Sequence, residues 1–342
     1  MWARNCPMSS PAHTQASLPL CQLIATGGTI AMKIDPERGG AVPALSGDDL
    51  LAAVPLISRV ARLEVRELFN IPSDHMDAES WVKLKHAVDD ALARPEMTGV
   101  IISHGTDTLE ETAWFLDLTV ASRKPVVLVG AQRNASVPDF DGPRNLLNAA
   151  RICVDDGARN QGVMVAMNNQ INAAREVTKT HTADVEAFKS GDFGLLGVID
   201  EDRVVFSRHS ARRQHVPLRT SALPRVEIVP MFAGASGDLV RAAVTLGARG
   251  IVVQALGFGN VNASMFAAIS DAIACGVVVA ISTRVPNGRV QPAYGFEGGG
   301  LTLKAAGAVF ADNLSPHKAR ILLMLLLQDA RTPQQLQSMF DQ

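Results

Sequence analysis

The chain has 342 residues, a formal net charge of −2 and a sequence pI of about 6.4. This length exceeds the usual size of a single hydrophobic core, so we expect two domains. The near-neutral charge argues against a nucleic-acid or anionic-membrane partner, because such proteins are usually strongly basic. Hydrophobic residues make up 47% of the chain and aromatic residues only 5%, which favours a sheet covered by helices that pack through Ala, Val and Leu.

The first 20 residues contain no apolar stretch long enough for a signal peptide, and we interpret them as a disordered lead-in. The chain contains four cysteines: Cys6, Cys21, Cys153 and Cys275. None of them forms a pair with metal-site spacing. Cys21 and Cys275 lie in apolar stretches that predict burial, so we expect inert thiols in a reducing compartment, with disulfides as the alternative. The apolar stretch 321–327 is too short to span a bilayer, and we predict a cytoplasmic protein.

Strand and helix patterns alternate through residues 20–206. In chain order we predict strands at 21–26, 61–68, 99–103, 125–130 and 162–168, and helices at 46–54, 77–93, 108–120 and 141–154. Ser46 is an expected N-cap, and Thr108 followed by Glu111 is typical of a capping box. Asp141 and Pro143 favour a helix start at that point. The alternation predicts an N-terminal domain with a parallel sheet and helices on both faces.

Residues 207–224 interrupt this pattern with polar, basic and Pro-punctuated sequence, and we interpret them as a linker. The alternation then resumes. We predict strands at 225–232, 250–256 and 277–283, and helices at 236–248, 263–274, 315–330 and 332–340. Residues 225–342 are therefore expected to form a second, smaller α/β domain.

Polar residues cluster where three of the predicted strands end. They are Gly28 and Thr29 after the first strand, Ser73 and Asp74 after the second, and Thr106 and Asp107 after the third. Because the carboxyl ends of parallel strands lie on one edge of a sheet, these residues are expected to converge on one crevice. The stretch TGGTIA does not match a dinucleotide-binding fingerprint, and its two glycines form either an oxyanion-binding nest or a tight turn.

A threonine hydroxyl needs a base to become a nucleophile, because it is un-ionised at neutral pH. For His104 we expect a local hydrogen-bonding role at the turn rather than catalysis. Lys179, in the polar and β-branched stretch REVTKTHTADV, is the better candidate, and a solvated lysine on an edge strand is its alternative. A neighbouring Asp would favour the ammonium form, whereas burial would favour the neutral amine. Thr106, Lys179 and Asp107 thus form a testable relay.

Several common signatures of catalytic and cofactor sites are missing from the sequence. There is no H-E-x-x-H, G-x-S-x-G, P-loop or C-x-x-C motif. We therefore expect neither a metal nor a cofactor.

Five stretches together resemble the bacterial L-asparaginase (asparaginase/glutaminase) family. They are IATGGTIAM (24–32), SHGTDTLEETAWFLDLTV (103–120), PVVLVGAQR (125–133), DGPRNLLNAA (141–150) and REVTKTHTADV (175–185). The resemblance extends from about Leu20 to the C-terminus. It implies a homotetramer, a dimer of dimers, whose two-domain α/β subunits hydrolyse a side-chain amide to a carboxylate and ammonia without a cofactor.

The resemblance also implies roles for single residues. Thr29 matches the nucleophilic threonine on a mobile N-terminal lid, and Thr106 matches a second active-site threonine in a relay with Lys179 and Asp107. Ser73 matches a residue that binds the substrate carboxylate, and Asp107 would also contact the substrate ammonium. The other predicted substrate-binding positions are Gly28, Asp74 and Ala131.

The expected lid departs from the family pattern. Residues 31–45 contain Gly39 and Gly40 and show no apolar period, as expected for a closing lid or, alternatively, for a plain exposed loop. The periplasmic branch of the family carries a lid tyrosine, but the only tyrosine of this chain is Tyr294.

The substrate pocket departs from the pattern as well. Asp74 stands where the periplasmic branch has a glutamine, and a second carboxylate beside Asp107 would strengthen ammonium binding but repel a carboxylate or take up a proton. The asparagine that a neighbouring subunit contributes aligns with Phe258 or Asn260, and a later glutamate with Tyr294 or Glu297. These differences leave alternatives to L-asparagine open. They are a different amide (glutamine, D-asparagine or a non-amino-acid amide) or, in another class, a non-catalytic amino-acid-binding protein.

Overall fold

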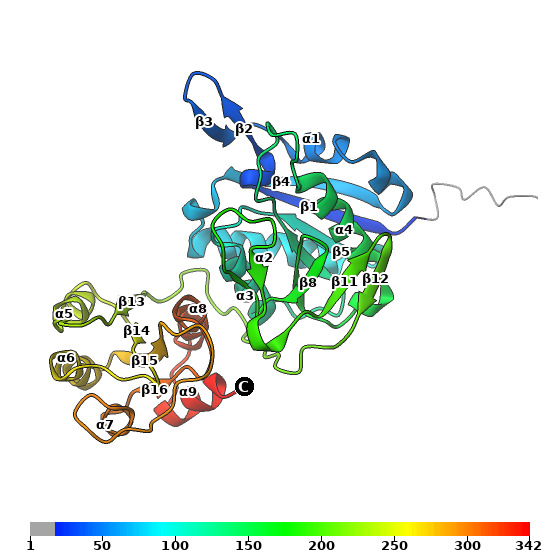
Figure 1. Cartoon of the computed structure of the whole chain (residues 1–342). Helices are drawn as coiled ribbons and strands as arrows, with labels where there is room; N and C mark the ends of the chain where they lie inside the picture. The colour runs from blue at the N-terminus through cyan, green and yellow to red at the C-terminus, as the bar shows by residue number, and fades with distance from the viewer. Residues whose placement is uncertain (1–17) are drawn as a thin grey trace, which may run out of the picture.

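The structure is a computed structural model that describes residues 18–342. Cys6 and most of the expected lead-in therefore lie outside the described residues. The chain forms a large N-terminal α/β body and a smaller C-terminal one beside it (Figure 1). The large body is built on an eight-stranded sheet with the order β12-β11-β8-β7-β6-β5-β1-β4.

The five parallel strands of this sheet and its four helices agree with the sequence prediction to within a few residues. The strands are β1 (Leu20–Gly27), β4 (Arg62–Ile71), β5 (Met97–Ser103), β6 (Val126–Val129) and β7 (Val163–Met167). The helices are α1 (Gly47–Ala52), α2 (Ala78–Ala93), α3 (Leu109–Thr119) and α4 (Gly142–Val154). Side chains of α2 and α3 fill the core on one face of the sheet, and those of α1 and α4 fill the core on the other. The prediction of helices on both faces is therefore confirmed.

Three further strands extend the sheet on one side and were not predicted. They are β8 (Gln170–Ala173), β11 (Gly197–Asp200) and β12 (Arg203–Phe206), all antiparallel to their neighbours. Between β7 and β8 the chain reverses over Asn168 and Asn169, whose φ angles are 47° and 61°. Two successive left-handed residues are typical of a tight hairpin turn. The sheet is thus mostly parallel, with an antiparallel edge.

Two helix starts show how local signals compete with tertiary contacts. Ser46 caps α1, and Asp49 completes a capping box there. Thr108 is the N-cap residue of α3 as expected, but the predicted capping box is wrong, because the Thr108 hydroxyl donates to the Ser73 carbonyl at 2.6 Å instead of binding the helix start. This hydroxyl therefore ties the start of α3 to the end of β4.

The C-terminal body contains a four-stranded parallel sheet in the order β13-β14-β15-β16. Its strands are β13 (Val226–Pro230), β14 (Gly250–Ala255), β15 (Val278–Thr283) and β16 (Val309–Phe310). Its helices are α5 (Asp238–Thr245), α6 (Ala263–Ala274), α7 (Gly300–Ala305), α8 (Pro316–Leu326) and α9 (Pro333–Phe340). The burial predicted for Cys275 is wrong, because this residue ends α6 and is exposed, whereas Cys21 and Cys153 are buried. The domain boundaries given above stay a prediction.

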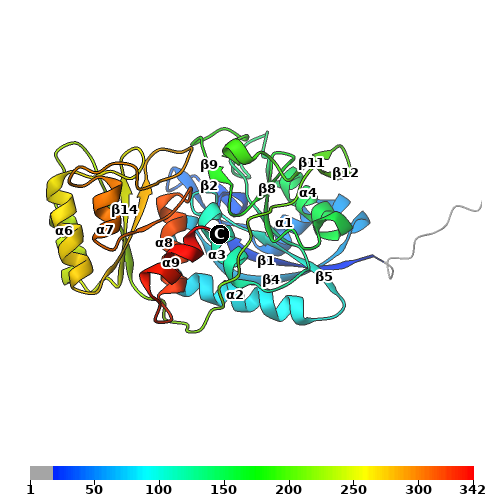
Figure 2. The same ribbon diagram turned by 90° about the horizontal axis from the view of Figure 1, so that it is seen from below.

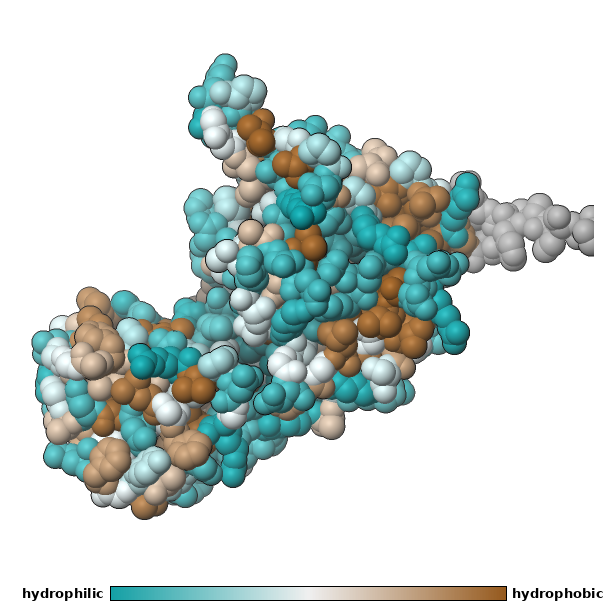
Figure 3. Space-filling model, in the orientation of Figure 1, coloured by the Kyte–Doolittle hydropathy of each residue, from teal (hydrophilic) through white to brown (hydrophobic). Residues whose placement is uncertain are grey.

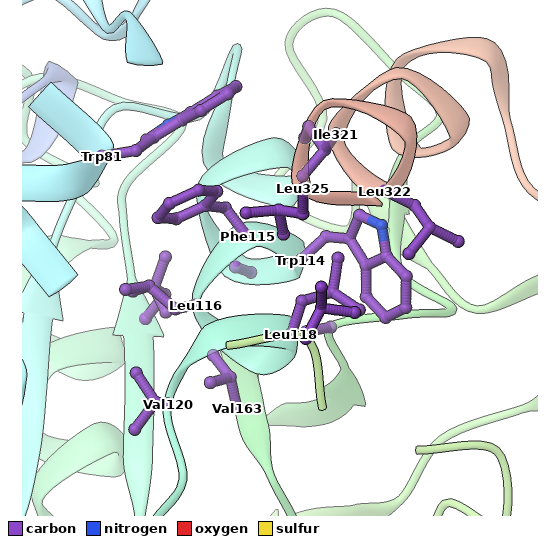
Figure 4. Packing of buried hydrophobic residues seen from close by; sticks show 14 of the residues in the cluster. Trp81, Trp114, Phe115, Leu116, Leu118, Val120, Val163, Ile321, Leu322 and Leu325 are labelled. Carbon is purple, nitrogen blue, oxygen red and sulfur yellow. The ribbon is translucent and has the colours of Figure 1, made fainter. Parts of the chain in front are cut away.

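Helix α8 joins the cores of the two bodies. It packs against the C-terminal sheet and also against α3 (Figures 1 and 2). In Figure 4, Trp114 and Phe115 of α3 face Ile321, Leu322 and Leu325 of α8 within one cluster of buried residues. The Trp114 indole N–H also donates to the Lys318 carbonyl at 3.1 Å. This shared core fixes the C-terminal body against the helix that begins beside Thr106.

Candidate active site

Three strand ends meet at one edge of the large sheet, at Gly28 after β1, Ser73 after β4 and Gly105 after β5. A Cβ atom on Gly28 would lie 2.1 Å from the Gly105 backbone nitrogen, and a Cβ on Gly105 would lie 2.7 Å from the Ser73 Oγ. Gly28 also has a φ of 83°, which side chains rarely adopt. Both positions therefore need glycine for the backbones to approach this closely.

Hydrogen bonds between the loops fix this edge. The Gly28 N–H donates to the Ile71 carbonyl at 3.0 Å. The Asp107 N–H donates to the Ser73 hydroxyl at 3.2 Å. Ser73 itself is buried, so its hydroxyl and carbonyl serve as a junction between β4 and the start of α3. The loops that carry the candidate residues are therefore held in place before any ligand binds.

Lys179 joins the two polar residues at the start of α3. Its Nζ lies 2.8 Å from the Thr106 Oγ1 and 2.7 Å from the Asp107 Oδ1. Thr106 is buried and the Lys179 side chain is 15% exposed, whereas the Asp107 side chain is 69% exposed. The structure thus brings together the three residues of the relay hypothesis. Gln132, which sequence reasoning missed, lies 3.3 Å from the Thr106 hydroxyl through its Oε1.

Thr29 follows Gly28 directly and is half-buried. It begins a short 3₁₀ turn, Thr29–Ala31, that closes with a 2.8 Å bond from the Ala31 N–H to the Gly28 carbonyl. The backbones of Gly28 and Gly105 are in contact. Thr29 directly follows Gly28, and Thr106 directly follows Gly105. Within the described residues the Thr29 hydroxyl has no hydrogen-bond partner.

The segment expected to form a lid is a β-hairpin rather than an irregular loop. Its strands are β2 (Met32–Asp35) and β3 (Gly40–Pro43), joined by a turn over residues 36–39 that ends at Gly39, where φ is 65°. The hairpin projects from the body, and its tip is mainly hydrophilic (Figures 1 and 3). At its base the Ala135 N–H donates to the Met32 carbonyl at 3.0 Å.

His104 has the local role expected from its position at the turn. It is fully buried, and its Nε2 contacts the Thr112 Oγ1 at 2.9 Å, while its Nδ1 lies 2.7 Å from the Gly105 carbonyl. The Trp81 indole N–H also donates to the Thr112 Oγ1, so the Thr112 proton is free to point at His104. The imidazole then carries its proton on Nδ1. Burial lowers the pKa of His104 to about 4, so it is neutral at pH 7 and supports the turn.

A buried carboxylate lies behind Lys179, and sequence reasoning missed this as well. Glu110, in the first turn of α3, accepts hydrogen bonds from the Lys179 backbone N–H at 3.1 Å and the Thr178 hydroxyl at 3.0 Å. Its position in the motif was visible, but an acidic residue in a first helical turn is usually explained by the helix dipole. The distant strand it contacts could not be deduced.

Comparison with known proteins identifies the family of this chain. Residues 21–212 match the family model described as "Asparaginase, N-terminal", and residues 225–340 match "Glutaminase/Asparaginase C-terminal domain". The chain belongs to the asparaginase family.

Relatives of known name match nearly the whole chain. It is 38% identical to "Probable L-asparaginase periplasmic" of Haemophilus influenzae, over 95% of this chain and 93% of that protein. It is also 38% identical to "L-asparaginase 2" of Escherichia coli, over 95% and 94%. A solved structure, "Probable Cytoplasmic L-asparaginase from Campylobacter jejuni", matches with a TM-score of 0.87 and 36% identity, covering 95% of this chain and 99% of that one.

The remaining positions suggested by the asparaginase resemblance divide into two groups. Asp74 is exposed beside Ser73, and Ala131 is buried after β6, so both lie near the three strand ends. The candidates Phe258, Asn260, Tyr294 and Glu297 belong to the C-terminal body. Across residues 18–342, no hydrogen bond joins this second group to Thr29, Thr106 or Lys179.

A cavity of about 700 Å³ lies between the β9–β10 ribbon (Thr178–Lys179 and Phe188–Lys189) and the C-terminal body. Its lining includes Thr178 but neither Thr29, Thr106 nor Lys179. The two threonines thus lie outside this cavity. Over residues 18–342, no three His, Cys, Asp or Glu side chains form a group that could hold a metal ion. Within the same residues, none of the helices is long and apolar enough to cross a bilayer.

Proposed function

We propose that this chain hydrolyses the side-chain amide of L-asparagine to L-aspartate and ammonia. The observation that carries the proposal is the contact of the Lys179 amine with the Thr106 hydroxyl at 2.8 Å and the Asp107 carboxylate at 2.7 Å. A hydroxyl, an amine and a carboxylate within hydrogen-bond distance form a proton relay that can activate an oxygen nucleophile. The names of the asparaginase relatives support L-asparagine as the substrate.

In the proposed mechanism the Thr29 hydroxyl attacks the amide carbon. The hydroxyl proton is passed to the leaving nitrogen, the C–N bond breaks and ammonia departs, which leaves the aspartyl group as an ester on the Thr29 oxygen. Water then adds to the ester carbonyl, and L-aspartate leaves while Thr29 recovers its proton. Backbone N–H groups at the glycine turns would stabilise the oxyanion in both steps, apart from the Gly28 N–H, which already donates to the Ile71 carbonyl.

The relay would accept a proton from the attacking nucleophile, which is the Thr29 hydroxyl in the first half-reaction and water in the second. Thr106 and Lys179 are placed to move a proton, and the Asp107 carboxylate stabilises the ammonium formed when Lys179 accepts one. The β2–β3 hairpin directly follows the turn of Thr29, so its movement would carry that residue over the substrate. We therefore retain the hairpin as the proposed lid.

The presence of Asp74 favours a second candidate function, the hydrolysis of an amide other than L-asparagine by the same mechanism. An exposed carboxylate beside Ser73 makes the ligand-facing surface more acidic than a glutamine would. It disfavours a carboxylate and favours an ammonium at this place. An amide other than L-asparagine, such as glutamine, D-asparagine or a non-amino-acid amide, is the alternative substrate.

We also infer a homotetramer that completes the site. Phe258, Tyr294 and Phe296 form an aromatic patch on the C-terminal body, with ring centroids 6.3 Å apart for the first pair and 5.7 Å for the second. These side chains are 44%, 44% and 54% exposed, and hydrophobic residues are visible on this body in Figure 3. Contiguous exposed aromatic surface is typical of a protein–protein contact.

The expected cytoplasmic location stays a prediction. The Haemophilus influenzae relative is described as periplasmic and the Campylobacter jejuni neighbour as cytoplasmic. Fractionation of cells that produce the natural chain would decide it.

The catalytic assignment is tested by ammonia release from L-asparagine. Thr29→Ala and Lys179→Met should each lower kcat at least about 1,000-fold, because one removes the nucleophile and the other the proton acceptor. Full activity in either variant would reject the assignment. A panel of a dozen amides separates asparagine from the other substrates, and tight asparagine binding in calorimetry without turnover would favour the non-catalytic binding protein.

A further inference from the structure

The strand that carries Lys179 is held by the buried carboxylate of Glu110. Glu110 is 6% exposed, and its Oε1 accepts both the Lys179 N–H and the Thr178 hydroxyl. The Lys179 Nζ meanwhile reaches Thr106 and Asp107, which lie just before the same helix, α3. The lysine is therefore attached to one helix start at its backbone and at its amine, and these two attachments define the direction of its side chain.

A buried lysine of the C-terminal body holds the residues just before Lys179. The Lys318 Nζ donates to the carbonyls of Ala174 at 3.0 Å, Arg175 at 3.1 Å and Val177. The Lys318 side chain is only 4% exposed, and burial of an ammonium is costly unless polar groups surround it. Three carbonyls supply that environment here. The contact therefore fixes a bend of the chain that has no helix or strand of its own.

The two residues are also coupled to each other. The Lys318 Nζ lies 3.8 Å from the Glu110 Oε2, which the His317 Nε2 approaches at 2.9 Å. Burial raises the pKa of Glu110, but the His317 hydrogen bond and the Lys318 charge outweigh it and hold this pKa at about 2. Burial lowers the pKa of Lys318 to about 8, against the opposing effect of Glu110. Near pH 7 the pair is therefore ionised.

We propose that Glu110 and Lys318 are positioning residues for Lys179. Together they fix residues 174–179 so that the amine stays within hydrogen-bond distance of Thr106 and Asp107. Neither residue contacts the reacting atoms. Because Lys318 belongs to α8, the C-terminal body aligns the relay of its own subunit. This inference rests on the proposed function, since it requires Lys179 to act on Thr106.

The first test compares substitutions of Glu110 with those of its neighbour. Glu110→Ala should lower kcat for L-asparagine about 100-fold with KM within about two-fold, because a misplacement of about 1 Å is enough for such a loss. Glu110→Gln should recover most of this activity, because the amide oxygen still accepts from Thr178 and Lys179. Glu111→Ala is the matched control, as this half-buried residue has no hydrogen bond to the Lys179 strand among the described residues, and it should keep wild-type kcat.

The second test addresses Lys318. Lys318→Met should lower kcat about ten-fold at unchanged KM, since three carbonyls lose their donor and the segment before Lys179 loosens. Should either buried variant fail to fold, Thr178→Val decides instead. It removes one hydroxyl bond to Glu110 on a half-buried strand and should lower kcat about five-fold.

Two outcomes overturn the inference. One is wild-type kcat in folded Glu110→Ala, Lys318→Met or Thr178→Val. The other is a loss that appears only in KM, because misalignment of a proton relay slows chemistry rather than binding. Failure of the proposed function is distinguished by Lys179→Met. If that variant keeps its activity the catalytic assignment falls, whereas an inactive Lys179→Met with an unaffected Glu110→Ala rejects the positioning role alone.

Discussion

The parallel strands of the two bodies end in different chemistry. Beyond the carboxyl ends of β1, β4 and β5 stand hydroxyls, a carboxylate and glycine turns, joined by hydrogen bonds between the loops. Beyond the ends of β13, β14 and β15 stand exposed apolar side chains, namely Phe232, Phe258 and Val285. Parallel strands thus support a candidate site in one body and a candidate contact surface in the other. The residues that follow the strands, and not the fold, determine whether an edge forms a site or a contact surface.

The edge beyond β1, β4 and β5, which carries Gly28, Ser73 and Gly105, is called the polar edge. The largest effect is expected when its loops are forced apart. Gly28→Ala should lower kcat about 1,000-fold and the free energy of unfolding by about 3 kcal/mol, because the new Cβ would stand 2.1 Å from the Gly105 nitrogen. Gly276→Ala is a matched control, since Gly276 has a φ of 82° but open space around it. Gly276→Ala therefore introduces the same backbone strain as Gly28→Ala without the steric clash, and this variant should keep full activity. Ammonia release and urea unfolding measure both effects, and equal losses in the two variants would contradict the close-packing explanation.

The buried support of the polar edge can be tested through pH. The folded pKa of His104 is about 4, against an ordinary value of 6.5. Between these values the unfolded chain binds a proton that the folded chain excludes, so the free energy of unfolding should fall by about 3 kcal/mol from pH 6.5 to pH 4 through this group. His104→Gln should remove that part of the slope, and exposed His86→Gln should not. An unchanged slope in His104→Gln would refute the role of this buried ring.

The apolar edge is tested through assembly. Phe258→Ser combined with Tyr294→Ser should shift the protein to smaller species and lower the activity per subunit about ten-fold at low concentration, because exposed aromatic area drives association. Leu246→Ser is the control, since Leu246, the C-cap of α5, is 61% exposed but outside the aromatic patch. Light scattering after size exclusion and a dilution series of ammonia release measure the two effects. A double variant that remains fully assembled and active would show that the patch has another use.

The smallest effect is expected from Asp74, and it tests whether this carboxylate influences substrate selectivity. Asp74→Gln should raise KM about three-fold for 3-aminopropanamide, which lacks the carboxylate of asparagine, and lower it about three-fold for succinamic acid, which lacks the ammonium. The signs are opposite because a carboxylate attracts one substrate and repels the other. Asp202→Asn, at the exposed β11–β12 turn, serves as the control. If Asp74→Gln leaves the KM of each amide unchanged, Asp74 has no role in selectivity.

The parallel strands and most helices could be predicted because their signals are local. Apolar periodicity predicted the parallel strands β1, β4, β5, β6 and β7, and Ser46 caps α1 as expected. The antiparallel strands are short, but Asn168 and Asn169 between two apolar stretches gave a hairpin signal that could have been used.

The contacts of the candidate site were harder to predict because they join distant segments. Thr108 satisfied a local capping pattern, yet its hydroxyl bonds to Ser73, 35 positions earlier. Glu110 gave no sign of a partner 68 positions later in Thr178. Residue type and strand-end position could indicate which side chains gather at the edge, but single-sequence periodicity contains no information on which distant polar groups pair.

The core shared by α3 and α8 has a consequence for chimaeras of this family. Exchanging residues 225–342 for the matching part of a relative would replace Lys318, His317 and the leucines of α8 while leaving Glu110 and Trp114 in place. The recombined protein would then pair this α3 with a helix that packs on a different α3 in its own protein. A crossover that keeps α8 native, or that transfers α3 with it, retains the contacts of Glu110 and Trp114 with α8.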